Sequence, residues 1–277
     1  MTHEPTEPET SAPGRPTRRP EGARRGLAPR EHGAYGQLGL PVVTAIAMGR
    51  PTLASICLAT GAIAAFFAHE PVLVLTGQRG TRAQREDGGR ARQRVALLGA
   101  LTAAAGGAGL WLSPPAARAA AAAPVLLALA LAPLVARGQE KTATGELLAA
   151  ATLAGAGVPV AIAAGVTSAA AWGAWAAWCL SFAASTLAVR SVIAHARNPM
   201  SLPRRVIGPV GTLVALALFA RHGQLPIHAA LGALPMVLVA LFIAVRPPGP
   251  RSLKKVGWSL VGASVVLSLA LGIGNHL

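Results

Sequence analysis

Residues 64–80 read AAFFAHEPVLVLTGQRG, an apolar run that ends in two glycines and an arginine. The run reaches back to about residue 52, so some 25 residues pass with a single carboxylate and no lysine or arginine. An α-helix rises 1.5 Å per residue, and about 20 apolar residues cross the roughly 30 Å hydrocarbon core of a membrane. The stretch therefore predicts a membrane-spanning helix that is followed by a basic loop.

Eight other runs repeat this pattern. Of the 277 residues, 53% are hydrophobic and 13% are charged, about half the charge of a soluble domain. Several runs have no polar face, which argues against a soluble helical protein. Their many alanines and glycines favour close helix packing. The predicted fold is all-α, a polytopic transmembrane helical bundle of about nine helices, at about 34–49, 52–76, 95–112, 119–136, 147–166, 171–189, 206–220, 227–245 and 256–273.

The basic residues predict an orientation for this bundle. With the N-terminus in the cytoplasm, 22 of the 25 lysines and arginines fall inside, and only Arg50, Arg118 and Arg221 fall outside. Cytoplasmic loops carry an excess of lysine and arginine, so we predict a cytoplasmic N-terminus and an external C-terminus. The net charge of +15 is explained by these loops, and the expected partners are membrane lipids and not nucleic acid.

The chain divides into two parts. Residues 1–33 are rich in Pro, Arg, Glu and Thr and lack apolar periodicity, which predicts a disordered basic cytoplasmic tail. It has no apolar segment of the signal-peptide kind. Residues 34–277 form the predicted transmembrane domain. Cys57 and Cys179 lie in apolar runs, where we expect small core residues and no disulfide.

Glu70 is the only carboxylate inside an apolar segment, and His69 precedes it. Both lie some six or seven residues before the inner end of their helix, roughly 10 Å deep. An ionisable group at such depth is costly and suggests a functional site. The alternative is that Glu70 pairs with one arginine and locks the bundle; both interpretations stay open here.

Further candidates lie at the same predicted side of the membrane. Lys141 follows the fourth predicted helix, and Thr144 is the expected N-cap of the fifth. Arg190 and Arg197 are seven residues apart, so they share a helical face and suit an anion clamp, with His195 between them. The alternative is that the arginines extend to lipid phosphates at the surface.

The stretch APREHGAYGQLGLP, residues 28–41, places Glu31 and His32 before the first helix, on the predicted inner side. We interpret it as the rim of a site; a membrane anchor is the alternative. His32, His69 and His195 all fall on the predicted inner side, where three histidines could bind a metal or a haem iron. Because no pair of them has the i, i+4 spacing, no metal or other cofactor is predicted; this alternative stays open, and no catalytic residue is assigned. The predicted ligand-binding residues are Glu31, His32, His69, Glu70, Lys141, Arg190, His195 and Arg197.

Two family resemblances follow from these motifs. REHGAYGQLGLP together with HEP at residues 69–71 resembles the YwiC-like family, bacterial integral membrane proteins of unassigned activity, which implies a place in the bacterial cell membrane. The layout is also similar to the UbiA prenyltransferase superfamily, which has nine helices and polar motifs after helices 2 and 6. HEPVLVLTG and RSVIAHAR stand where those motifs begin, and RGQEKTATGELL resembles the stretch between helices 4 and 5.

The departures from the UbiA pattern bear on function. In that superfamily, aspartates hold the Mg²⁺ that binds a prenyl diphosphate, but here Arg190 and Arg197 replace two of them and Asp87 is the one aspartate in the chain. Mg²⁺ needs oxygen ligands. The resemblance therefore implies a cytoplasm-facing basic cavity that binds an anionic lipid or isoprenoid-type amphiphile without Mg-dependent prenyl transfer. A divergent UbiA-type prenyltransferase and a small-anion carrier are the alternatives, so whether the protein is an enzyme stays open.

Overall fold

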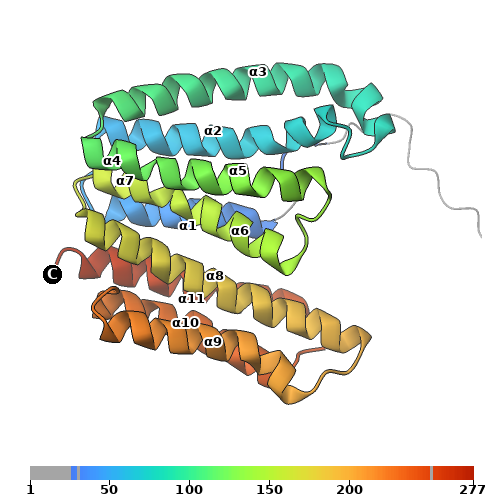
Figure 1. The fold of residues 1–277 in the computed structure, drawn as a ribbon, viewed down its shortest axis with the longest axis vertical. Helices are drawn as coiled ribbons and strands as arrows, with labels where there is room; N and C mark the ends of the chain where they lie inside the picture. Colours follow the sequence, from blue (N-terminus) through green and yellow to red (C-terminus); the bar gives the residue numbers. More distant parts are fainter. Residues whose placement is uncertain (1–25, 30–31, 250–251) are drawn as a thin grey trace, which may run out of the picture.

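A computed structural model describes residues 26–29, 32–249 and 252–277. Over these ranges the chain forms helices and no strand (Figure 1). Most of the predicted tail, residues 1–33, lies outside the described residues. The helices are α1 (His32–Ala47), α2 (Leu53–Leu75), α3 (Thr81–Leu112), α4 (Pro115–Ala120), α5 (Ala122–Ala136), α6 (Ala143–Gly155), α7 (Gly157–Ala163), α8 (Ser168–Arg197), α9 (Leu202–Arg221), α10 (Ile227–Val245) and α11 (Leu253–Gly274).

The described helices run back and forth along one direction (Figure 1). Two pairs act as single spans, since α4 and α5 together cover Pro115–Ala136, and α6 and α7 together cover Ala143–Ala163. Eight spans in the described chain are long and apolar enough to cross a membrane, and α1 adds a shorter helix of 16 residues. The predicted all-α polytopic bundle is confirmed, and every predicted segment corresponds to one of these passes.

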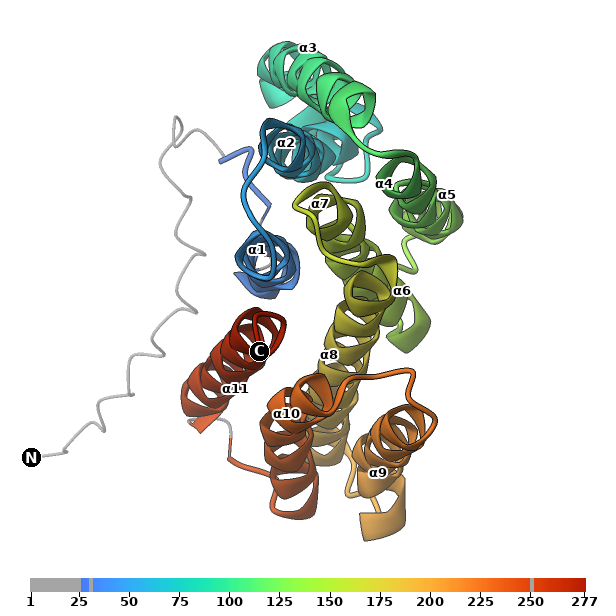
Figure 2. The same cartoon turned by 90° about the vertical axis from the view of Figure 1, so that its left-hand side faces the viewer.

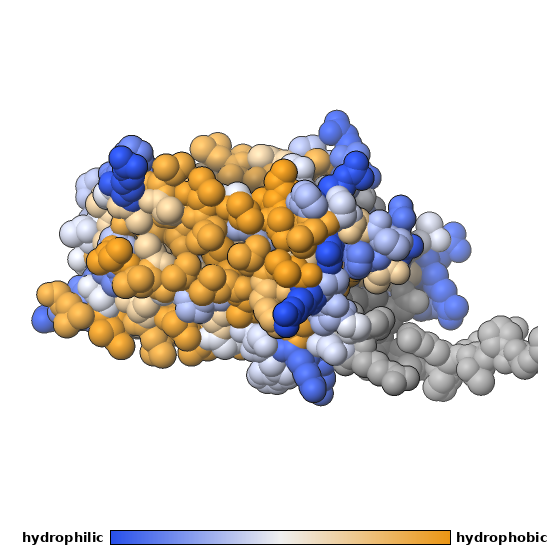
Figure 3. All heavy atoms as spheres, turned by 90° about the horizontal axis from the view of Figure 1, so that it is seen from below, coloured by the Kyte–Doolittle hydropathy of each residue, from blue (hydrophilic) through white to orange (hydrophobic). Residues whose placement is uncertain are grey.

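The alternating passes gather the basic connections at one end of the bundle. We call this the basic end; it holds the start of α1 and the connections at residues 76–80, 137–142 and 198–201. Among the described lysines and arginines, only Arg50, Arg118 and Arg221 lie in or beside the connections of the opposite end. Figure 3 shows a broad apolar band between hydrophilic residues at the two ends. This separation is the arrangement that the positive-inside pattern requires.

Helix α3 is longer than the sequence predicted. It begins at Thr81, whereas the apolar run predicted a helix only from about residue 95. The polar first part continues the helix because one face packs on the end of α2: Ala83 and Ala91 are buried there, and Leu27 packs on Val74 and Ala91. Tertiary packing thus extends the helix past the apolar band.

Small residues let neighbouring helices approach closely. A Cβ on Gly61 of α2 would lie 2.9 Å from the backbone of Gly106 in α3, and one on Gly49 would lie 2.4 Å from the carbonyl oxygen of Ala164. Because lipid chains are as apolar as the helices, such close packing is a main source of attraction between membrane helices. The alanine- and glycine-rich runs therefore specify contact faces as well as spans.

Viewed along the bundle, the helices lie in an elongated array (Figure 2). Helices α2 and α3 pack on each other at one edge, and α9 and α10 lie at the other. Helix α1 packs on α6, α7 and α11, whereas α8 packs on α6, α9 and α10. The arrangement separates the predicted site residues on α2 from those on α8.

Candidate functional site

Glu70 forms a bidentate ion pair with Arg79. Helix α2 continues through Pro71 to Leu75, and the turn that follows uses Gly77 and Gly80 at φ of 76° and 91°, a region that glycine adopts without strain. This turn brings Arg79 back along the helix, where Nε donates to Oε1 at 2.9 Å and Nη2 to Oε2 at 2.6 Å.

The Glu70 side chain is only 2% exposed, against 24% for Arg79. A buried carboxylate is stable as an anion only when it is paired and hydrogen-bonded, and this geometry provides both. Gln84 supports the turn, since its Nε2 donates to the carbonyl of Leu75 at 2.6 Å. Glu70 was interpreted from the sequence either as part of a functional site or as one half of a structural ion pair. The contacts favour the ion pair, which holds the turn after α2 against the end of that helix.

The predicted histidines are not brought together in the described structure. His69 is exposed on α2. His195 lies near the end of α8, where its Nδ1 accepts a hydrogen bond from the backbone N–H of Met200 at 2.8 Å. Glu31 is outside the described residues, and the side chain of His32 is not described. Within the described ranges no group of three His, Cys, Asp or Glu is placed to hold a metal ion.

Arg190 joins α8 to the connection between α5 and α6. Its Nη1 donates to the backbone carbonyl of Lys141 at 2.8 Å and lies 3.0 Å from Oε2 of Glu146. The sequence predicted Lys141 and Arg190 as anion contacts, and the fold places them side by side. Glu146 was not singled out. Its position in the first turn of α6, where a helix favours negative charge, is the signal that marks it.

The connection before α6 is held tightly in place. Thr142 is the N-cap, since its hydroxyl accepts from the N–H of Gly145 at 3.1 Å and donates to the carbonyl of Gln139 at 2.8 Å. The prediction of Thr144 as the cap was wrong by two residues, because the connection folds back over the first turn of α6. A Cβ on Gly145 would lie 2.6 Å from the carbonyl oxygens of Gln139 and Glu140.

The described contacts of Arg190 involve only one nitrogen of its guanidinium. Both contacts use Nη1, and within the described chain Nε and Nη2 have no hydrogen-bond or ion-pair partner. The side chain is 37% exposed. The Nε–Nη2 edge presents two parallel N–H donors, the geometry that matches the paired oxygens of a phosphate or carboxylate.

The surroundings of Arg190 are strongly positive. Over the described chain the basic end holds fifteen lysines and arginines against five carboxylates. Four of these carboxylates already pair with arginines, namely Glu70, Glu86, Asp87 and Glu146. Arg137, Lys141 and Arg197 are exposed there. The excess cations adjoin the apolar band, where the headgroups of a membrane would lie.

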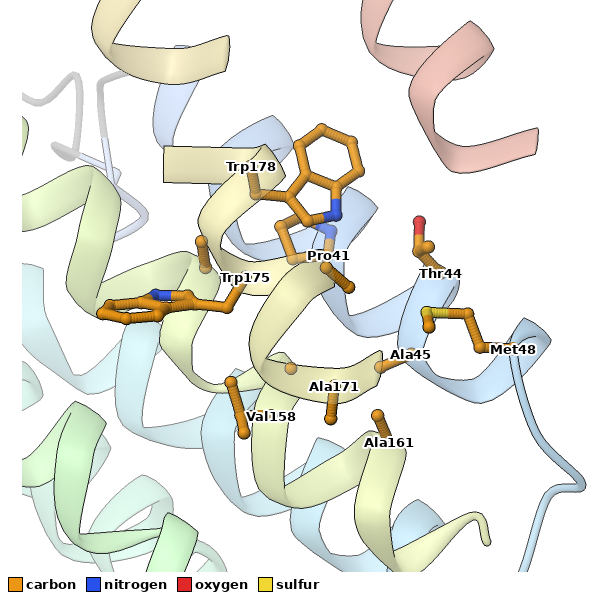
Figure 4. A pocket seen from close by; sticks show the side chains of 12 residues that line it. Pro41, Thr44, Ala45, Met48, Val158, Ala161, Ala171, Trp175 and Trp178 are labelled. Atoms are coloured by element: carbon orange, nitrogen blue, oxygen red, sulfur yellow. The ribbon is translucent and has the colours of Figure 1, made fainter. Parts of the chain in front are cut away.

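A small pocket lies elsewhere, between α1, the junction of α6 and α7, and α8 (Figure 4). Its lining, taken over the described part of the chain, has no charged side chain and includes Pro41, Val158, Trp175 and Trp178. It is therefore a different site from the basic cavity that the sequence predicted at the inner ends of the helices. The predicted cavity stays a prediction.

The fold and its apolar band define the class of the protein: it is a multi-pass helical membrane protein with one strongly basic end. The family model described as YwiC-like protein matches residues 28–162, from the segment before α1 to α7, so the resemblance is confirmed over this range. The matched range includes Glu70 and Lys141 but not Arg190. No curated protein and no solved structure matches the chain, so the UbiA-like layout stays a prediction.

Proposed function

We propose that the protein binds the phosphate headgroup of an anionic lipid at its basic end, in the site formed by Arg190, Lys141 and the start of α6. The observation that carries the proposal is the arrangement of Arg190. Its Nη1 is positioned by the Lys141 carbonyl and by Glu146, while its two-donor Nε–Nη2 edge lacks a partner in the described chain. A guanidinium held in this way binds a phosphate with little loss of side-chain entropy.

The surfaces beside the site favour a ligand with an apolar tail. Helix α5, which leads into the connection that carries Lys141, exposes Val125, Leu126 and Leu129. A lipid with its phosphate at Arg190 would lay its acyl chains along such apolar side chains. A phosphate without a tail would gain only the polar contacts. An isoprenoid phosphate shares this chemistry, so the experiment compares the two sources.

The ion pairs of the basic end support direct contact between arginine and phosphate. Glu70, which stands at the first acidic position of the UbiA-type motif, and Asp87, the one aspartate of the chain, pair with Arg79 and Arg90. Mg²⁺ would have to compete with these arginines for its oxygen ligands. A phosphate that binds Arg190 directly does not have to displace an arginine from its carboxylate.

The test is lipid retention in nanodiscs of phosphatidylcholine with a minor fraction of phosphatidylglycerol, followed by mass spectrometry of the lipids that stay bound in mild detergent. The wild type should retain phosphatidylglycerol in preference to phosphatidylcholine. Arg190→Ala should lose this preference, and Arg190→Lys should keep part of it, because lysine keeps the charge but not the paired donors. Arg221→Ala, at the opposite end, is the matched control and should behave as the wild type.

Two additions separate binding from folding and identify the source of the phosphate. The double variant Arg190→Ala with Glu146→Gln avoids an unpaired carboxylate and should lose the preference while keeping its unfolding temperature. Farnesyl diphosphate is added as a competitor in a separate series. Equal phosphatidylglycerol retention in Arg190→Ala and wild type would refute the proposal, and displacement by farnesyl diphosphate alone would favour the isoprenoid alternative.

A further inference from the structure

The pocket between α1, the α6–α7 junction and α8 contains polar atoms that the packing does not satisfy (Figure 4). It lies in the half of the bundle away from the basic end, since Thr44 comes near the end of α1 and Ala171 near the start of α8. The cavity volume is about 10 Å³. This is close to the smallest cavity that holds one water molecule.

Two side-chain atoms of the lining are buried and have no hydrogen-bond partner in the described chain. They are Oγ1 of Thr44, a residue 1% exposed, and Nε1 of Trp178, a residue 2% exposed. Figure 4 shows the Trp178 nitrogen and the Thr44 oxygen on the same side of the pocket. One atom belongs to α1 and the other to α8, so a ligand between them would join the two helices.

Comparable side chains in the same bundle do find partners. Trp175 lines the same pocket, and its Nε1 donates to the carbonyl of Ala151 at 3.0 Å. The hydroxyls of Thr102 and Thr152 donate to the carbonyl four residues earlier, at 2.8 and 2.7 Å, as threonines in helices often do. Thr44 makes no such bond, although its carbonyl accepts from the N–H of Met48 at 2.8 Å in the ordinary helical way.

The chemistry of the lining selects a small neutral ligand. Among the described residues no charged side chain lines the pocket, and an ion would lose its hydration without an opposite charge nearby. The indole N–H only donates, and the threonine hydroxyl both donates and accepts. The ligand must therefore accept one hydrogen bond from Trp178, make a second with Thr44, and fit a space of one water molecule.

We propose that the pocket binds a single water molecule, which accepts from Nε1–H of Trp178 and hydrogen-bonds to Oγ1 of Thr44. The water links α1 to α8 beside the junction where Ala156 separates α6 from α7. The site is distinct from the lipid site, since Trp178 and Arg190 are twelve residues apart on α8, about 18 Å along the helix. Its failure would leave the proposed function untouched.

The experiment uses the full chain in nanodiscs with ¹⁵N-labelled tryptophan. The indole signal of Trp178, assigned by its loss in Trp178→Phe, should show magnetisation transfer with a long-lived water. Thr44→Val keeps the side-chain shape but removes the hydroxyl, so the transfer should fall to the background level. Ser181→Ala is the matched control, because Oγ of Ser181 is also buried with no hydrogen-bond partner among the described residues but does not line the pocket; the water transfer to Trp178 in this variant should equal that of the wild type.

A second measurement tests the link between the helices. Thr44→Val and Trp178→Phe should each lower the unfolding temperature, and the double variant should lower it by less than the sum, because either change already releases the water. If Trp178→Phe fails to fold, the indole signal of Trp178 is assigned by elimination, with phenylalanine variants of the other four tryptophans, and the transfer measurement on Thr44→Val still decides the matter. Absence of water transfer to Trp178 in the wild type, or transfer that Thr44→Val leaves unchanged, overturns the proposal.

Discussion

Arg190 donates a hydrogen bond from Nη1 to the backbone carbonyl of Lys141, 49 residues earlier in the chain, at 2.8 Å. The bond attaches the last turns of α8 to the connection before α6. It also aligns the arginine, because the same nitrogen lies 3.0 Å from the Glu146 carboxylate. Arg190 and the connection that carries Lys141, both predicted from the sequence as parts of an anion site, are thus in direct contact, and the position of the arginine is set by a backbone atom as well as by charge.

The tight fold of the connection before α6 predicts a sensitive glycine. Gly145→Ala would place a Cβ 2.6 Å from the carbonyl oxygens of Gln139 and Glu140, so the connection must move away from α6. We expect a lower unfolding temperature together with weaker retention of anionic lipid, because Lys141 moves with the connection. Gly107→Ala is the control, since no described atom beyond its own helical turn lies within 4 Å of its Cβ position and alanine favours a helix. Wild-type lipid retention in Gly145→Ala would contradict this coupling.

The Glu70–Arg79 pair predicts a large loss of stability when one partner is removed. Breaking a buried ion pair from one side costs about 3 kcal/mol, because the remaining charge is left buried. Arg79→Ala should therefore destabilise the protein strongly in thermal or denaturant unfolding. The exposed pair of Arg82 and Glu86 is the control, and Arg82→Ala should cost less than about 1 kcal/mol. If Arg79→Ala and Arg82→Ala lowered the free energy of unfolding equally, the Glu70–Arg79 pair would not stabilise the fold more than an exposed ion pair does.

The same pair predicts a partial rescue. A double variant, Glu70→Leu with Arg79→Met, removes both charges and fills the space with apolar side chains. Replacing a buried ion pair in this way is often neutral. The double variant should therefore be more stable than Arg79→Ala alone in the same unfolding assay. Lower stability in the double variant would assign Glu70 a role beyond this pair.

The distribution of charge predicts the topology. Reporter fusions at residues 85 and 200 should read as cytoplasmic, and fusions at residues 115 and 223 as external. The first two positions lie at the basic end and the last two at the opposite end. Lysines and arginines that flank apolar helices set orientation by staying in the cytoplasm. Cytoplasmic readings at both 115 and 223 would reject the nine-pass arrangement.

Magnesium should have little effect on the lipid site. Because Glu146, the carboxylate in contact with Arg190, already pairs with that arginine, no set of oxygen ligands for Mg²⁺ is expected there. Retention of phosphatidylglycerol should be the same with Mg²⁺ and with a chelator, as measured by mass spectrometry of the bound lipid. A requirement for Mg²⁺ would favour the divergent prenyltransferase alternative.

The amino-acid sequence determined the number of passes and the grouping of the basic connections, because both depend on local properties. The length of an apolar run decides whether it can span a membrane. The lysines and arginines gather in every second connection, because successive passes cross the membrane in opposite directions. Arg190 and Lys141 were also predicted from the sequence as anion contacts, because Arg190 ends an apolar run and Lys141 follows one.

Only the tertiary structure decided which of these residues meet. The pairing of Glu70 with Arg79 depends on a turn that reverses the chain over nine residues, and the early start of α3 depends on packing against α2. Thr44 and Trp178 lie more than 130 residues apart, and each reads in the sequence as an ordinary member of an apolar helix. Hydropathy and helical spacing describe one segment at a time, whereas a hydrogen bond or a shared pocket requires two segments to be placed within a few ångströms of each other.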